Sequence, residues 1–204
     1  MNIVFQGDSI TDASRGEGYG QGYAMLVSGI LGEEEAGQHA FYNRGVGGNR
    51  VVDMYARIKK DCLNLEPDVL SVLIGVNDVW HELGDSNGVA AGKFEKIYDM
   101  FINEVTEHNP NVKIIIFGAY VVRGAATIEN WDYFRKEVDL RAAAAKRIAE
   151  KYSKNCTYIP LQEVFDEAIK RAPEEQWSRD GVHPTPQGHM LIAKEWIKAY
   201  KAFK

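Results

Sequence analysis

The sequence predicts an α/β fold built on a five-stranded parallel sheet. Short apolar runs of strand length alternate with longer stretches in which apolar residues recur at helical spacing, and this alternation is typical of βαβ units. No linker-like stretch or long repeat interrupts it. Because a domain usually takes about 100–200 residues, we expect the 204 residues to form one domain, residues 1–204.

The predicted strands are the five short apolar runs. They are NIVF (2–5), AFYN (40–43), DVLSVLIG (68–75), KIIIFGAY (113–120) and CTYIPL (156–161). In open parallel sheets, ligands bind where the carboxyl ends of the strands gather. Residues that do chemistry should therefore lie just after strands.

Apolar residues at helical spacing predict a helix after each strand. A loop over residues 15–23 leads into the first of them. The residues that mark the other four, with Arg141 as one polar exception, are Val51, Tyr55, Ile58 and Cys62; Phe94, Ile97, Tyr98, Phe101, Ile102 and Val105; Phe134, Val138, Arg141, Ala145, Ile148 and Tyr152; and Met190, Ala193, Trp196, Ile197 and Tyr200.

Charge and composition exclude several classes of partner. The net charge is −5 and the basic residues are scattered among acids, which argues against nucleic acid. The N-terminal MNIVFQGDS has no basic region before its apolar run, unlike a secretory signal, and no segment approaches the roughly 18 apolar residues of a membrane helix. Cys62 and Cys156 lie far apart without metal-like spacing. We therefore expect a cytoplasmic protein with no membrane partner, no metal and no cofactor.

Four short stretches follow predicted strands or precede the last helix. They are Gly7-Asp8-Ser9, Gly45-Val46-Gly47-Gly48-Asn49, Gly75-Val76-Asn77-Asp78 and Asp180-Gly181-Val182-His183-Pro184. Each alone is weak, because a turn or a phosphate-binding loop can look the same. Together they can converge on one edge of the sheet, which makes the set specific.

The residue types in these stretches are those of nucleophilic catalysis. A serine hydroxyl becomes a good nucleophile when a base takes its proton, and His183 is the histidine placed to act on Ser9. Asp180, three residues earlier, can accept the other ring N–H of His183 and hold the tautomer. An attacked carbonyl would develop negative charge, which the N–H groups of Ser9 and Gly48 and the amide of Asn77 could stabilise.

These four contexts, GDSI, GVGGN, GVND and DGVHP, resemble the four blocks of the SGNH hydrolases, also called GDSL-type esterases and lipases. The blocks run from residue 7 to 184 in the family's order. The resemblance implies a flavodoxin-like three-layer α/β/α fold, a metal-free triad of Ser9, His183 and Asp180, and ester hydrolysis. The chain has GDSI where the family name expects GDSL.

A closer resemblance is to a subgroup of carbohydrate acetylesterases that includes intracellular acetylxylan esterases. The stretches that carry it are GDSITD, NRGVGGNR, IGVNDVW and DGVHPTPQGHMLIA. It implies removal of O-acetyl groups from short acetylated carbohydrates, often by a homo-oligomer. The alternatives are a short-chain acylhydrolase, lysophospholipase or thioesterase of the same family and a non-catalytic carbohydrate-binding protein on this fold.

Three further residues are candidates for substrate binding. Trp80 follows Asn77 by three and Trp177 precedes Asp180 by three, so either ring could stack on a sugar or simply bury apolar area. Asp8 is the third, with a structural hydrogen-bonding role as its alternative. Related acetylesterases often carry a tryptophan directly before the triad aspartate, where this chain has Arg179.

The tripeptide Gly-Asp-Ser occurs a second time, in LGDSNG at residues 83–88, which also fits the G-x-S-x-G pattern of a nucleophile elbow. An elbow needs a strand running into it, and VWHEL before this copy is of mixed polarity. We interpret residues 83–88 as a loop with a turn at Asn87-Gly88, and Ser86 as a loop serine.

Overall fold

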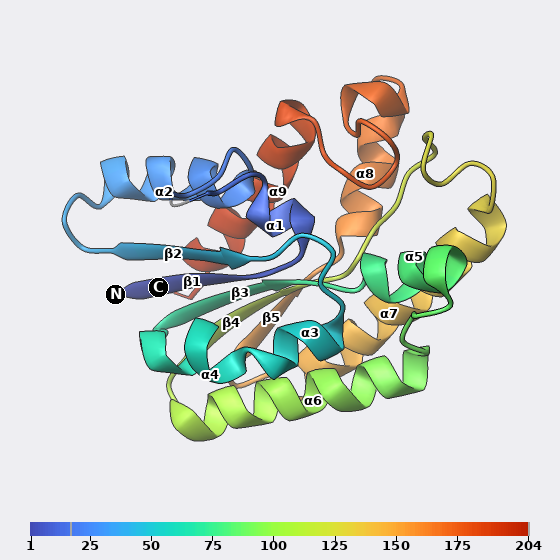
Figure 1. Ribbon diagram of the computed structural model, residues 1–204. Coiled ribbons are helices and arrows are strands. Elements are labelled where there is room, and N and C mark those ends of the chain that lie inside the picture. Colours follow the sequence, from blue (N-terminus) through green and yellow to red (C-terminus); the bar gives the residue numbers. More distant parts are fainter. Residues whose placement is uncertain (17, 204) are drawn as a thin grey trace.

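The computed structural model describes residues 1–16 and 18–203, and its centre is one parallel sheet (Figure 1). The strands are β1 (Asn2–Gly7), β2 (Ala40–Gly45), β3 (Val69–Leu73), β4 (Lys113–Phe117) and β5 (Cys156–Ile159). Their order is β2-β1-β3-β4-β5, and all neighbouring pairs are parallel. The predicted fold class and the five predicted strands are confirmed.

Helices cover both faces of the sheet, which gives the three layers (Figure 1). One face carries α2 (Tyr23–Glu34), α8 (Leu161–Ile169) and α9 (Pro186–Lys201). The other carries α3 (Val51–Ala56), α4 (Ile58–Asp61), α6 (Ala91–His108) and α7 (Trp131–Lys151). The short helices α1 (Ser9–Asp12) and α5 (Val76–Asp85) begin near the carboxyl ends of β1 and β3, and two 3-10 turns span Leu63–Leu65 and Glu174–Gln176.

Each face of the sheet packs into its own apolar core, because side chains alternate along a strand. Ile3 and Phe5 of β1 belong to the core under α2 and α9, whereas Val4 belongs to the core under α3 and α6. Phe5 lies between the rings of Tyr23 and Trp196, at centroid distances of 5.8 and 5.6 Å. Apolar packing therefore holds β1 from both faces of the sheet.

The helices differ from the sequence prediction in three places. The helix predicted over Val51–Cys62 divides at Arg57 into α3 and α4. Residues 83–85 are the last residues of α5, so the prediction of a loop there is wrong; Ser86, with φ of 51°, caps its end. α8 was not predicted, because its nine residues lie close to the end of β5.

Within the described residues, no helix is both long and apolar enough to cross a membrane.

Candidate active site

The carboxyl ends of β1, β2 and β3 bring three of the four stretches together. Because β2 and β3 lie on opposite sides of β1, the chain reverses its direction across the sheet there, and this is the switch point at which α/β folds bind ligands. Ser9 begins α1 after β1, Gly48 lies in the loop after β2, and Asn77 lies in the first turn of α5 after β3. The loop before α9 supplies Asp180 and His183.

Ser9, His183 and Asp180 form a continuous hydrogen-bonded row. Ser9 Oγ lies 2.9 Å from His183 Nε2, and His183 Nδ1 lies 2.7 Å from Asp180 Oδ2. Asp180 Oδ1 accepts the backbone N–H groups of Val182 and His183 at 2.9 and 2.8 Å. This arrangement can pass a proton from the hydroxyl to the imidazole and can stabilise the imidazolium that results.

Hydrogen bonds set the charges of this row. Burial opposes ionisation of Asp180, but the bonds from the ring and N–H of His183 and from Val182 outweigh it and lower the pKa of Asp180 to about 2. The hydrogen bond to Asp180 raises the pKa of His183 above its usual value, against a smaller effect of burial. Asp180 is therefore a carboxylate across the physiological range, and His183 is poised to take up a proton.

Asp8 caps α1, the helix that begins at Ser9, and is not among the residues that line the cavity. Its Oδ1 accepts the N–H of Ile10 at 2.9 Å and so caps α1. The residue is 1% exposed, and burial raises the pKa of its carboxyl to about 7. Burial and the bond to Ile10 favour the structural hydrogen-bonding role for Asp8, and its contact with substrate stays a prediction.

The three predicted oxyanion donors lie on the three strand ends. Within the described part of the chain, the N–H groups of Ser9 and Gly48 donate to no other protein group. Gly48 has φ of 77°, a conformation that favours glycine. Asn77 is 4% exposed, and its Nδ2 donates to Asn49 O at 3.1 Å, which fixes the amide beside the Gly48 loop.

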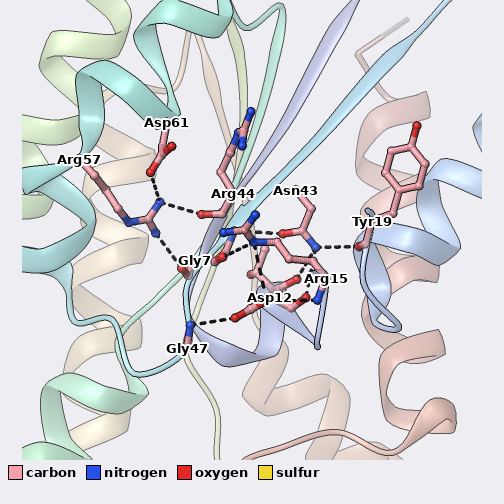
Figure 2. Close-up of polar contacts among 11 residues, drawn as sticks. Gly7, Asp12, Arg15, Tyr19, Asn43, Arg44, Gly47, Arg57 and Asp61 are labelled. Carbon is pink, nitrogen blue, oxygen red and sulfur yellow. Dashed lines mark hydrogen bonds and ion pairs between the residues drawn. The ribbon is translucent and has the colours of Figure 1, made fainter. Parts of the chain in front are cut away.

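The loop that carries Gly48 is held on both sides. Asp12 Oδ2 accepts the N–H of Gly47 at 3.1 Å (Figure 2). At Gly45, where β2 ends, a Cβ would lie 2.2 Å from the N of Asp12, so only glycine allows this approach. Asp78 accepts the N–H of Val51 with both carboxylate oxygens, at 3.1 and 3.2 Å, although burial raises its pKa to about 7.

Arg57 joins the two loops directly (Figure 2). Its guanidinium donates to Gly7 O at 3.0 Å, to Arg44 O at 2.7 Å and to Asn49 Oδ1 at 2.7 Å. These acceptors belong to the ends of β1 and β2 and to the residue after Gly48. Sequence analysis assigned no role to Arg57 or Asp78. Each is an ordinary charged residue of a helix until the fold shows which groups it bonds to.

The two tryptophans differ in their relation to the row. The ring of Trp80 lies 5.9 Å from that of His183, centroid to centroid, and also packs near Phe134. Trp177 donates its Nε1–H to Ala172 O at 3.1 Å, and its ring lies beside the Arg171 guanidinium and the apolar core. Trp177 thus anchors the loop before α9, and Trp80 is the one of the pair that contacts the row.

A cavity of about 420 Å³ opens beside Ser9. Its lining is mostly polar, with Ala13 and Pro184 as the apolar members, and comprises Ser9, Asp12, Ala13, Ser14, Gln21, Arg179, His183, Pro184 and His189. Neither Trp80 nor Trp177 is among them. In residues 1–16 and 18–203, no three His, Cys, Asp or Glu side chains gather as a metal site.

Comparisons with known proteins agree with this geometry. The model of the GDSL-like lipase/acylhydrolase family matches residues 5–191. The chain is 32% identical to an acetylxylan esterase of Geobacillus stearothermophilus, over 96% of this chain and 92% of that protein. Its structure superposes on that of Axe2, an acetylxylan esterase of the same species, with a TM-score of 0.85 at 30% identity, covering 97% of this chain and 93% of the other.

A GDSL-like lipase candidate from Parabacteroides merdae superposes with a TM-score of 0.91 at 36% identity, covering 97% of this chain and 94% of the other. Variants of Axe2 add a detail. An Axe2 aspartate whose replacement by alanine gives a catalytic mutant directly follows a tryptophan that has been replaced by isoleucine. In this chain the residue before Asp180 is Arg179.

The pKa values of the two histidines of the cavity should be shifted in opposite directions from the usual value of an imidazole. His183 should titrate above 6.5, and Asp180→Asn should lower its pKa because the charged acceptor is lost. His189 is the internal control: burial lowers its pKa to about 4, and its Nδ1 accepts the N–H of Tyr23. NMR titration of the imidazole resonances measures both; a His183 pKa unaffected by Asp180→Asn would contradict the described electrostatics.

Loss of the Arg57 guanidinium should loosen both loops. Arg57→Met keeps the aliphatic stem but removes the guanidinium bond to Arg44 O and one of the two donors to Gly7 O, which also accepts the N–H of Val46. A hydrogen bond to a charged group contributes about 1.5–3 kcal/mol, so amide exchange in residues 7–9 and 45–49 should accelerate about 10- to 150-fold. Hydrogen-exchange mass spectrometry measures it, with Arg147→Met as control, since Arg147 pairs with Glu95 at the surface. Equal protection in both variants would refute the joining role.

Proposed function

Because the chain belongs to the GDSL-like lipase/acylhydrolase family and is a carboxylic ester hydrolase, we propose that it removes O-acetyl groups from short acetylated carbohydrates through an acyl-enzyme. The acetylxylan esterase of G. stearothermophilus, similar over nearly the whole chain, supports a carbohydrate ester as the substrate. The reaction needs only a nucleophile, a base, an acid that orients the base, and donors for the oxyanion.

In this proposal Ser9 is the nucleophile. Asp180 accepts Nδ1–H of His183, which leaves Nε2 free to take the Ser9 hydroxyl proton at 2.9 Å. Ser9 Oγ then bonds to the acetyl carbonyl carbon, and as the tetrahedral intermediate collapses the imidazolium gives its proton to the departing ester oxygen, which leaves as the sugar hydroxyl. A water molecule, deprotonated by the same imidazole, then attacks the acetyl carbon; the bond to Ser9 Oγ breaks, the imidazolium returns the proton to Oγ, and acetate is released.

The proposed oxyanion donors are the N–H groups of Ser9 and Gly48 and the Nδ2 amide of Asn77. Each comes from a different strand end, and each is held by backbone geometry or by a hydrogen bond before substrate arrives. Preorganised donors lower the barrier because they need no rearrangement as charge develops; losing one costs about 3–4 kcal/mol in other hydrolases.

The observation that carries the choice of substrate is the polarity of the cavity beside Ser9. A long acyl chain needs an apolar groove, whereas hydroxyl, amide, imidazole and guanidinium groups make up most of this lining. Such groups match the hydroxyls of a saccharide as hydrogen-bond partners. An acetyl group is also small enough to need no groove of its own.

The substrate class is tested by acetate release. Acetylated xylo-oligosaccharides should be deacetylated with a higher kcat/KM than esters or thioesters of long acyl chains, because the polar cavity stabilises the sugar and offers little to the chain. Coupled acetate assays and product analysis by mass spectrometry give the two rates. A preference for long acyl chains would overturn the sugar ester proposal and favour a lysophospholipase or thioesterase.

The nucleophile is tested by two serine variants. Ser9→Ala should lower kcat by about 10⁵- to 10⁶-fold, since loss of the nucleophile removes the covalent route. Ser86→Gly is the matched control: Ser86 caps α5 with φ of 51°, so glycine removes the hydroxyl without backbone strain and should leave kcat within about twofold. Esterase turnover, with circular dichroism to verify folding, decides between them; loss of turnover in Ser86→Gly alone would invert the assignment.

A further inference from the structure

The guanidinium of Arg179 places a positive charge at the cavity, directly beside the proposed triad. It precedes Asp180 in the chain and lines the same cavity as Ser9 and His183. Its side chain is exposed. The mechanism described above assigns it no role.

The backbone around Arg179 is fixed, so its side chain starts from a defined place. The N–H of Arg179 donates to His183 O at 2.8 Å. Ser178 Oγ donates to the same carbonyl at 3.1 Å and accepts the N–H of Gly181 at 2.9 Å. Because these bonds fix the backbone of the loop, the Cα of Arg179 stays beside the cavity that its side chain lines.

The charge of Arg179 is not neutralised by the protein. Among residues 1–16 and 18–203, its guanidinium has no hydrogen-bond or ion-pair partner. Asp12, the carboxylate of the cavity lining, already accepts the N–H of Gly47 and lies 3.7 Å from Arg15. The hydrogen bond to Asp180 raises the pKa of His183 and burial lowers that of His189; the positive charge of Arg179 opposes the first shift and adds to the second.

The corresponding place in Axe2 is occupied differently. The residue before the aspartate of its catalytic mutant is a tryptophan, whose apolar face suits an uncharged sugar ring. A guanidinium offers a planar pair of N–H donors that matches a carboxylate in two parallel hydrogen bonds. The change from an aromatic ring to a guanidinium therefore changes the ligand group that this position can recognise.

We propose that Arg179 is a specificity-determining residue that binds a carboxylate on the substrate, so that the preferred substrates are acetylated saccharides bearing a uronic acid. The inference rests on the proposed function. One guanidinium balances the single charge of a carboxylate, whereas a phosphate dianion paired with it would keep a net negative charge in the cavity that Asp12 also lines. The substrate carboxylate pairs with the guanidinium of Arg179, and the ester carbonyl remains within reach of Ser9 in the same cavity.

The test compares two acetylated xylo-oligosaccharides of equal length, one with a glucuronic acid branch and one without. In the wild-type enzyme, kcat/KM for the acidic substrate should exceed that for the neutral one by about 3- to 10-fold, as an exposed charge-assisted pair allows. Salt at 0.5 M should reduce this ratio, because the screening length is then about a few ångströms. Arg179→Gln should bring the ratio close to one through a higher KM for the acidic substrate, and Arg179→Lys should retain part of it.

Arg171→Gln is the matched control, because it removes the same charge from a residue that lies over Trp177 and outside the cavity lining. It should keep the wild-type ratio. A wild-type ratio of one, or a ratio that Arg179→Gln leaves unchanged, would overturn the inference.

Calorimetry with the deacetylated oligosaccharides separates this inference from the proposed function. If neither substrate loses acetate, yet the acidic oligosaccharide binds more tightly in an Arg179-dependent way, the proposed function falls and the carboxylate site stands. If both substrates lose acetate at equal rates and both oligosaccharides bind equally, the carboxylate site falls and the function stands.

Discussion

One guanidinium holds together the strand ends on which the active site is built. Arg57 donates to Gly7 O and Arg44 O, at the ends of β1 and β2 (Figure 2). It also donates to the side chain of Asn49. Gly7 O accepts the N–H of Val46 as well, so the guanidinium adds to a bond that already links the two strand ends. Because a single planar group bonds to both strand ends and to a loop side chain, the distance between the Ser9 turn and the Gly48 loop does not depend on either loop alone.

Carboxyl groups around the site do two kinds of work, and burial separates them. Asp8 and Asp78 lie inside the fold, where burial raises each pKa to about 7, and they bind backbone N–H groups at the starts of α1 and α3. Asp180 is more accessible, and its hydrogen bonds lower its pKa to about 2. Of these three carboxyls, Asp180 is the one held as a carboxylate where the imidazolium forms, and the two buried ones position the backbone.

The sheet and the loop before α9 divide the work of the site. The proposed nucleophile and oxyanion donors start from β1, β2 and β3, whose positions two apolar cores determine. The loop that carries Arg179, Asp180 and His183 is held by its own hydrogen bonds, including those of Ser178 and Trp177, and by bonds that Tyr120, Val122 and Ala126 donate to it from the segment after β4. An exposed side chain of this loop can therefore be replaced without disturbing the sheet. This is why Arg179, which lies close to His183 in the loop, can determine substrate specificity in our proposal.

The sequence by itself determined the parallel α/β fold and the residues that meet at Ser9, because strand-length apolar runs ending in Gly-Asp-Ser, Gly-Gly-Asn and Val-Asn-Asp imply one sheet edge. It did not predict α5 and interpreted the end of that helix as a loop, since a helix of mixed polarity looks like a loop until one side is seen to be buried. Only the tertiary structure decided that Asp8 is a buried cap and that Arg57 joins two strand ends. It also showed that Arg179 lacks a partner among the described residues. Burial and long-range hydrogen bonds depend on segments that are distant in the sequence, and no local pattern records them.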